Sequence, residues 1–132
     1  PTQTPLPVGA GIYDDLNPNI AFTGAWTRYT SNGCYDSTPT YPRGAKYSQA
    51  AGNSASLRFN GSGAELLYAK YSGVGILRIE IDGVFVADLD QSAGIQAYQN
   101  RWVSPALTPG VHTVTFTHLS GSYTDIDAIE VK

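Results

Sequence analysis

The stretch that decides the fold is Gly75 to Asp90, GILRIEIDGVFVADLD. Its central dipeptide, Asp82-Gly83, is one that readily adopts the positive φ angles of a type I′ turn, so the stretch predicts a β-hairpin closed by two residues. A two-residue turn sets which residues face each other, here Ile81 with Val84, Ile79 with Val86, and Leu77 with Asp88. One face is then apolar and expected to be buried: Leu77, Ile79, Ile81, Val84 and Val86. Hairpins with one dry face belong to antiparallel sandwiches and barrels, so the stretch predicts an all-β fold.

Other parts of the chain show the same alternation in short runs. Ala55, Leu57 and Phe59 alternate with polar residues, as Val114 and Phe116 alternate with threonines. A period of two is typical of half-buried strands, and no window shows a convincing helical period. Further strands are expected over residues 20–22, 26–30, 45–48, 55–60, 65–70, 96–103, 112–119 and 123–131. About ten short strands separated by turns predict an antiparallel β-sandwich or jelly roll, with Leu57, Phe59, Val114 and Phe116 in its core.

Length and charge narrow the class of protein. A chain of 132 residues is long enough for one domain with a sizeable core. Its formal net charge of −3 argues against a nucleic-acid partner, which requires a basic surface. The sequence has no apolar run long enough to span a membrane. Only 14% of the residues are charged and nine are tyrosine, a composition common in secreted bacterial modules, so we expect a secreted or cell-surface protein.

The first residues differ in composition from the rest. Residues 1–11, PTQTPLPVGAG, are rich in proline, threonine and glycine and offer little to a core. This composition predicts the remnant of a linker, followed by a single module over residues 12–132. A linker at a domain edge also predicts neighbouring domains in a longer chain.

Catalytic motifs are hard to find in this sequence. It has no HExxH motif and no serine in a nucleophile elbow, and His112 opens an expected strand, where a structural hydrogen bond is its expected role. The single cysteine, Cys34, permits no internal disulfide and is expected to be a small, partly buried side chain. We therefore expect no enzymatic activity from the module.

Several longer motifs follow one another in a recognisable order. They are IYDDLNPNIAFTGAW, a loop rich in Tyr, Ser and Gly, GNSASLRFNGSGAELLY, IDGVFVADLD, LTPGVHTVTF and YTDIDAIEV. In this order the chain resembles bacterial modules with the galactose-binding-like jelly roll, similar to carbohydrate-binding modules appended to glycoside hydrolases and surface proteins. The resemblance covers nearly all of residues 12–132. It implies sugar binding through loops or a concave sheet face, and a structural calcium ion near the two ends of the chain.

Four aspartates are candidate ligands of this calcium ion. Asp125 and Asp127 share a strand face with Ile129 and Val131, so burial of those two residues would carry Asp127 inward. A buried carboxylate requires an arginine, backbone donors or a cation. Calcium selects such oxygen ligands, and the resemblance places the first strand beside the last, which makes Asp14, Asp15, Asp125 and Asp127 the candidate ligands. The alternative is that Asp14 and Asp15 cap a turn while Asp127 accepts backbone hydrogen bonds.

Aromatic and planar polar side chains are what a sugar site requires, because rings stack on pyranose faces and amides or guanidinium groups pair with hydroxyls. Residues 29–47 are dense in tyrosine, including Tyr29 and Tyr47, and residues 96–102 form a second group that begins with Gln96. A third lies at residues 70–73. The candidate ligand-binding residues are Tyr35, Asp36, Tyr41, Arg43, Tyr71, Tyr98, Asn100 and Trp102.

Two functions fit these observations. The first is a non-catalytic carbohydrate-binding module that targets a parent enzyme or surface protein to a polysaccharide or oligosaccharide. The second is a structural or adhesion spacer of the same fold in a multidomain surface protein. A binding module is expected to gather its aromatic side chains in a groove, whereas a spacer is expected to show scattered ones.

Overall fold

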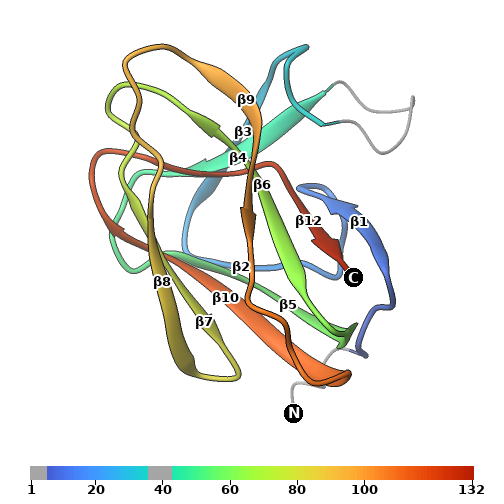
Figure 1. Cartoon of the computed structure of the whole chain (residues 1–132). Coiled ribbons are helices and arrows are strands. Elements are labelled where there is room, and N and C mark those ends of the chain that lie inside the picture. The colour runs from blue at the N-terminus through green and yellow to red at the C-terminus, as the bar shows by residue number, and fades with distance from the viewer. Residues whose placement is uncertain (1–5, 36–42) are drawn as a thin grey trace.

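The computed structural model of the chain describes residues 6–35 and 43–132. This part of the protein is built from strands, and none of its residues is helical, so it contains no helix that could cross a membrane (Figure 1). The strands are β1 Gly11–Asp14, β2 Ala21–Thr23, β3 Trp26–Thr30, β4 Gly44–Ser48, β5 Ser54–Gly61, β6 Ala64–Lys70, β7 Ile76–Ile81, β8 Val84–Asp90, β9 Ala97–Val103, β10 Gly110–Ser120, β11 Thr124–Ile126 and β12 Ala128–Val131.

The described strands form three antiparallel sheets. Their orders are β1-β12-β6-β9, β2-β5-β10-β7-β8 and β11-β4-β3. The first two sheets enclose the core, and the third lies at the end of the sandwich that is uppermost in Figure 1. The expected all-β antiparallel sandwich is therefore confirmed.

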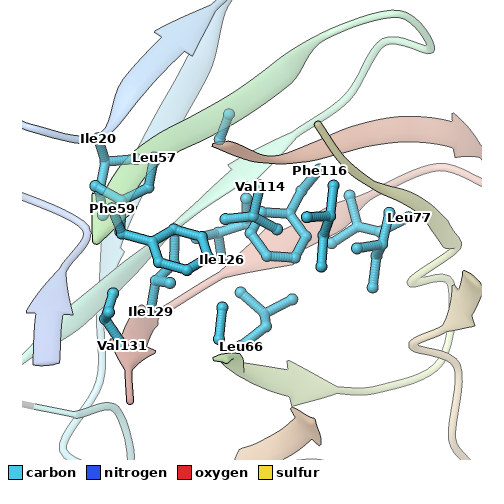
Figure 2. Close-up of a cluster of buried hydrophobic side chains, with 14 of the residues drawn as sticks. Ile20, Leu57, Phe59, Leu66, Leu77, Val114, Phe116, Ile126, Ile129 and Val131 are labelled. Atoms are coloured by element: carbon cyan, nitrogen blue, oxygen red, sulfur yellow. The ribbon is translucent and has the colours of Figure 1, made fainter. Parts of the chain in front are cut away.

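The core fills the space between the four-stranded and five-stranded sheets (Figure 2). Leu57 and Phe59 of β5 and Phe116 of β10 contribute side chains that are at most 1% exposed. Leu66 of β6 and Ile129 of β12 pack against them from the other sheet. The alternating patterns of residues 55–60 and 112–119 thus predicted the buried faces correctly.

The hairpin closes as predicted but changes register after its first two residue pairs. Asp82 and Gly83 both have positive φ, 55° and 78°, and Ile81 faces Val84. Beyond Glu80 a β-bulge adds one residue to β8, so Ile79 faces Ala87 rather than Val86. The predicted pairing of Leu77 with Asp88 is also wrong, because Leu77 faces Leu89. Asp88 lies instead opposite Arg78, with which it forms an ion pair at 2.9 Å.

The apolar face of β8 is only partly buried, which corrects another prediction. Val84 was expected in the core but is 67% exposed, because β8 is the edge strand of its sheet. Val86 packs against the core from a partly buried position. Leu77, Ile79 and Ile81 of β7, one strand further in, are buried as expected.

The N-terminal segment contributes more than a linker would. Val8 packs against the core, and its backbone NH donates to the Arg58 carbonyl at 3.0 Å. Gly11 already begins β1, a strand that the sequence did not predict, and β1 pairs with β12. The expectation that residues 1–11 add nothing to the core is therefore wrong for Val8.

The expected strand over residues 123–131 divides at Asp127. Its first part, β11, pairs with β4, whereas its second part, β12, lies between β1 and β6. At the division the NH of Asp127 donates to the Leu67 carbonyl at 3.0 Å. One continuous segment thus joins two sheets, and both of its faces are buried.

His112 has the structural role expected of it. Its Nδ1 lies 2.6 Å from Oδ2 of Asp82 in the hairpin turn, and its Nε2 lies 2.7 Å from the Thr108 carbonyl. These two acceptors raise the pKa of the imidazole, and the His112 ring lowers the pKa of the Asp82 carboxyl. The contact ties the turn between β7 and β8 to the start of β10.

Candidate functional site: a tyrosine-lined pocket

Alternation along the third sheet places three polar side chains on one face. Tyr47 of β4 lies directly opposite Asp125 of β11. Tyr29 of β3 pairs with Ala45, two residues before Tyr47, and therefore shares the same face. Lys46, between Ala45 and Tyr47, points to the opposite face and lies 4.1 Å from the centre of the Phe22 ring.

Loops complete a pocket of about 400 Å³ over this face. The residues that line it are Tyr29, Tyr47, Ala69, Tyr71, Ser72, Val74, Gln96, Tyr123 and Asp125. Tyr71 and Tyr123 form an exposed part of the wall, with 48% and 40% of their surface accessible. The volume is in the range of small-molecule sites.

Three of the four tyrosines pack in a row. The ring centres of Tyr29 and Tyr47 are 5.9 Å apart, and those of Tyr47 and Tyr123 are 5.7 Å apart in an edge-to-face arrangement. Because the planes are inclined to one another, the rings form a bent aromatic wall. Tyr71 is contributed by the segment between β6 and β7.

A buried carboxylate is part of the same lining. Asp125 is 4% exposed, its Oδ2 accepts a hydrogen bond from the Tyr29 hydroxyl at 2.6 Å, and its Oδ1 accepts one from the Ala69 NH at 2.8 Å. Burial raises the pKa of Asp125 to about 6. Burial and the nearby carboxylate raise the pKa of the Tyr29 phenol well above its ordinary value. Tyr29 therefore remains protonated and donates to Asp125.

Gln91 holds Asp125 in place through the backbone. The Gln91 side chain is fully buried, its Nε2 donates to the Asp125 carbonyl at 2.8 Å, and its Oε1 accepts from the Asp125 NH at 2.9 Å. The Gln91 carbonyl also accepts from the NH of Tyr71 at 3.3 Å. The Gln91 side chain thus makes the two hydrogen bonds with the Asp125 backbone that a neighbouring strand would make with β11. Through its carbonyl, Gln91 also links Asp125 to Tyr71 in the pocket wall. Sequence analysis missed Gln91, which follows a strand in a polar run and carries no local signal.

The first and third groups of predicted ligand residues, from residues 29–47 and 70–73, are only partly brought to the pocket. Tyr71 lines it, as do Tyr29 and Tyr47 of the tyrosine-dense segment. Arg43 is not among the lining residues, and its Nη1 donates to the Asn32 carbonyl at 3.2 Å. Tyr35 also lies outside the lining. Asp36 and Tyr41 fall outside the residues that the structure describes.

The second group mostly serves other contacts. The Tyr98 ring packs so closely on Gly33 that a β-carbon there would clash with it. The Asn100 amide donates to the carbonyls of Ala97 and Tyr68, and Trp102 packs edge-to-face on Phe116 at 6.3 Å against the core. None of the three is among the pocket-lining residues, whereas Gln96 is. A role in sugar binding for Tyr98, Asn100 and Trp102 stays a prediction.

Tyr123 is a lining residue that sequence analysis did not name. It precedes β11, and its carbonyl accepts from the Gly75 NH at 2.6 Å while Val74 forms an isolated bridge with it. These contacts join segments about fifty residues apart, so no local pattern in the sequence reports them. Only its position two residues before Asp125, a candidate ligand, could have drawn attention to it.

The four candidate calcium ligands are all buried but do not form one ligand set. Within residues 6–35 and 43–132, no three Asp, Glu, His or Cys side chains converge on a point that could hold a metal ion. Asp14 Oδ1 accepts from the Leu16 NH at 3.2 Å, Asp15 Oδ2 pairs with the Arg28 guanidinium at 2.8 Å, and Asp127 Oδ2 accepts from the Tyr35 NH at 2.8 Å. The contacts of Asp14 and Asp127 are of the kind that the alternative to calcium requires, whereas Asp15 pairs with an arginine instead of capping a turn. Calcium binding by these residues stays a prediction.

Two oxygens in this group nevertheless lack a partner. Oδ1 of Asp15 and Oδ1 of Asp127 are buried and accept no hydrogen bond from the described part of the chain. Burial, together with the neighbouring carboxylates, raises the pKa of Asp127 to about 8. The same surroundings raise the pKa of the buried Cys34 thiol to about 12, so this cysteine is not a reactive thiolate.

A serine and a histidine also meet inside the protein. Ser48 Oγ lies 2.9 Å from Nδ1 of His118, and His118 Nε2 lies 2.8 Å from the Gly121 carbonyl. Both side chains are at most 1% exposed, which prevents a substrate from reaching the hydroxyl. The pair therefore stabilises the segment that leads to Tyr123 and is not a catalytic pair.

Comparison with known proteins begins with the sequence. No family model matches the chain. Among curated proteins, the A type blood N-acetyl-α-D-galactosamine deacetylase of Flavonifractor plautii is 25% identical over 116 residues. The matched region is 88% of this chain but 14% of the deacetylase, so the chain spans a small part of that relative.

Solved structures establish the fold more fully. A family 35 carbohydrate binding module from Clostridium thermocellum matches with a TM-score of 0.65 and 18% identity, over 92% of this chain and 95% of that one. The CBM36-1 domain of a multidomain xylanase from the hindgut metagenome of Trinervitermes trinervoides matches with a TM-score of 0.60 and 11% identity, at the same coverage. Longer enzymes also match, and the chain covers 28% and 30% of two of them. The chain thus has the β-sandwich fold of carbohydrate-binding modules, as the resemblance implied.

Proposed function

We propose that this protein is a non-catalytic sugar-binding module and that the tyrosine-lined pocket is its binding site. The observation that carries the proposal is the convergence of Tyr29, Tyr47, Tyr71 and Tyr123 on one pocket of about 400 Å³. A spacer domain would be expected to carry its aromatic residues singly, with no such convergence.

The chemistry of the lining suits a pyranose ring. Tyrosine rings offer apolar faces to the C–H groups of a sugar, and their hydroxyls reach its hydroxyls. Gln96 and Ser72 add polar groups that both donate and accept hydrogen bonds. A site of a few such contacts leaves many sugar hydroxyls in water, so we expect a Kd between about 1 μM and 1 mM.

Three statements about the whole protein rest on the same proposal. A module of this fold is consistent with targeting of a parent enzyme or surface protein to a polysaccharide, with covalent attachment to neighbouring domains, and with a secreted or cell-surface location. The alternative, a structural or adhesion spacer, predicts that no glycan binds in the pocket. Binding to a glycan panel, followed by location of the site, separates the two functions.

Replacing Tyr71 by alanine is expected to weaken binding of whichever glycan the panel identifies at least tenfold. The ring is 48% exposed, so its removal takes away stacking area without opening the core. Isothermal titration calorimetry measures the affinity, and thermal unfolding checks that the melting temperature is preserved.

The matched control is Phe85→Ala, which removes an equally exposed ring at 56% from β8, far from the pocket lining. Its affinity is expected to equal that of the wild type. Equal loss in both variants, or no loss in Tyr71→Ala, would place the sugar elsewhere on the protein.

We also propose that the protein binds a calcium ion. One observation supports this proposal: Oδ1 of Asp15 and Oδ1 of Asp127 are buried and lack hydrogen-bond partners. A buried carboxylate oxygen without a donor is costly, and a cation bound between such oxygens would remove the cost. The proposal no longer requires Asp14 or Asp125, whose carboxylates already accept hydrogen bonds from the protein.

Removal of calcium with a chelator is therefore expected to lower the melting temperature by several degrees, and added Ca²⁺ is expected to restore it. The physical reason is mass action, which contributes about 2.7 kcal/mol when the ion is present at a hundred times its Kd. The measurement is thermal unfolding at neutral pH, with Mg²⁺ as the comparison ion. A melting temperature indifferent to both chelator and calcium would overturn this proposal.

A further inference from the structure

The pocket lining contains a single charged side chain, and this side chain is acidic. Of the nine lining residues, Asp125 is acidic and none is Lys, Arg or His. Two of the roughly four acceptor positions of its carboxylate are used, by the Tyr29 hydroxyl and the Ala69 NH. The carboxylate thus retains the capacity to accept a further hydrogen bond from a ligand.

Two basic side chains of the third sheet, Arg28 of β3 and Lys46 of β4, are engaged in other contacts. The Arg28 guanidinium is engaged with Asp15 at 2.8 Å, and Lys46 extends over Phe22 on the opposite face of the sheet. A concave surface with charge of one sign attracts ligands of the opposite sign.

The tyrosine rings add a second attraction for positive charge. The face of an aromatic ring carries partial negative charge and attracts an ammonium group within about 6 Å of its centre. Tyr29, Tyr47 and Tyr123 are inclined to one another and stand beside the carboxylate, so an ammonium group in the pocket would meet ring faces and Asp125 together. A ligand carboxylate would be repelled by Asp125 and would meet no cation among the lining residues.

We infer that the pocket selects a sugar residue that carries a protonated amine over its neutral counterpart, and that it rejects uronic acids. This inference rests on the proposed function, since it names the class of sugar that the same pocket binds. Arg43, one of the candidate ligand-binding residues, is not part of the lining and therefore supplies no cation for a uronate carboxylate there.

The test changes the ligand and leaves the protein intact. The methyl glycosides of glucosamine, N-acetylglucosamine, glucose and glucuronic acid, and the corresponding galactose series, differ in charge on one ring framework. Each is titrated at about pH 7, where a sugar amine is mostly protonated, in one buffer containing chelator. Shifts of the tyrosine ring signals in NMR spectra report binding, and their loss in Tyr71→Ala locates it at the pocket.

The amine is expected to bind about three- to tenfold more tightly than the neutral sugar of the same series, and the glucuronide or galacturonide more weakly than either. N-acetylation is expected to abolish the advantage, because it removes the charge.

The outcomes separate the two proposals. Binding in which the neutral sugar or the uronide equals or exceeds the amine would overturn the inference and leave the sugar-binding function standing. Absence of tyrosine shifts with every glycoside would overturn both. An equal preference for the N-acetylated sugar would show that shape, not charge, is recognised, and would overturn the inference as well.

Discussion

Replacing Ile79 by alanine is expected to lower the free energy of unfolding by about 2–5 kcal/mol, because it removes three carbons from a fully buried position. Ile79 lies in β7, inside the five-stranded sheet, and pairs with Phe116 of β10. The surrounding strands cannot collapse into the space without breaking their own pairing. Urea unfolding of the two proteins measures the difference.

Val84→Ala is the matched control, because it shortens a branched apolar side chain of the same hairpin. At 67% exposure Val84 is expected to contribute less than about 0.5 kcal/mol. If Val84→Ala cost as much as Ile79→Ala, Val84 would be buried and the edge position of β8 described above would be wrong.

Gln91→Leu is the second variant with a large expected effect, about 2–5 kcal/mol of stability together with a loss of sugar affinity. Leucine fills similar space but leaves the NH and carbonyl of Asp125 without partners in a buried position, where each unsatisfied group costs about 1–3 kcal/mol. The same change loosens the wall that carries Asp125. Chemical unfolding and calorimetric titration of the identified glycan measure the two effects.

Gln49→Leu provides the comparison, since Gln49 is an exposed glutamine that follows β4. Its stability is expected to lie within about 0.5 kcal/mol of the wild type. Should Gln91→Leu unfold at the same urea concentration as Gln49→Leu, the bidentate contact of Gln91 with Asp125 would have no part in stabilising the fold. Retained affinity in a folded Gln91→Leu protein would show that Asp125 is positioned by other contacts.

The sequence by itself determined most of the strands and which of their faces are apolar, although it did not predict β1 or the division between β11 and β12. Alternation along residues 55–60 and 112–119 depends on the two-residue period of a strand, and the Asp82-Gly83 turn depends on local backbone preference. Both are local effects, so they can be recognised in the sequence without knowledge of the partner strands. The resemblance of the ordered motifs then indicated the type of sandwich, which the structure confirms.

Exposure at the edge of a sheet was decided by tertiary structure. Val84 and Ile81 have the same apolar character and face each other across the turn, yet one is 67% exposed and the other 6%. The difference arises because the opposing sheet covers β7 but not the end of β8. The alternation of residues along a strand indicates that one face is apolar. How far that face is covered depends on how the sheets pack.

The pocket, too, exists only in the folded protein. Its lining comes from β3, β4, β6, β11 and the segments before β7, β9 and β11, which are distant in the sequence. The tyrosine-dense segment and Tyr71 could be named as candidates from residue type alone. That Tyr123 and Asp125 join them, while Trp102 packs on the core, depends on the division of the last strand at Asp127 and on the side chain of Gln91. Long-range pairing decides these positions, because each is set by contacts with residues tens of positions away.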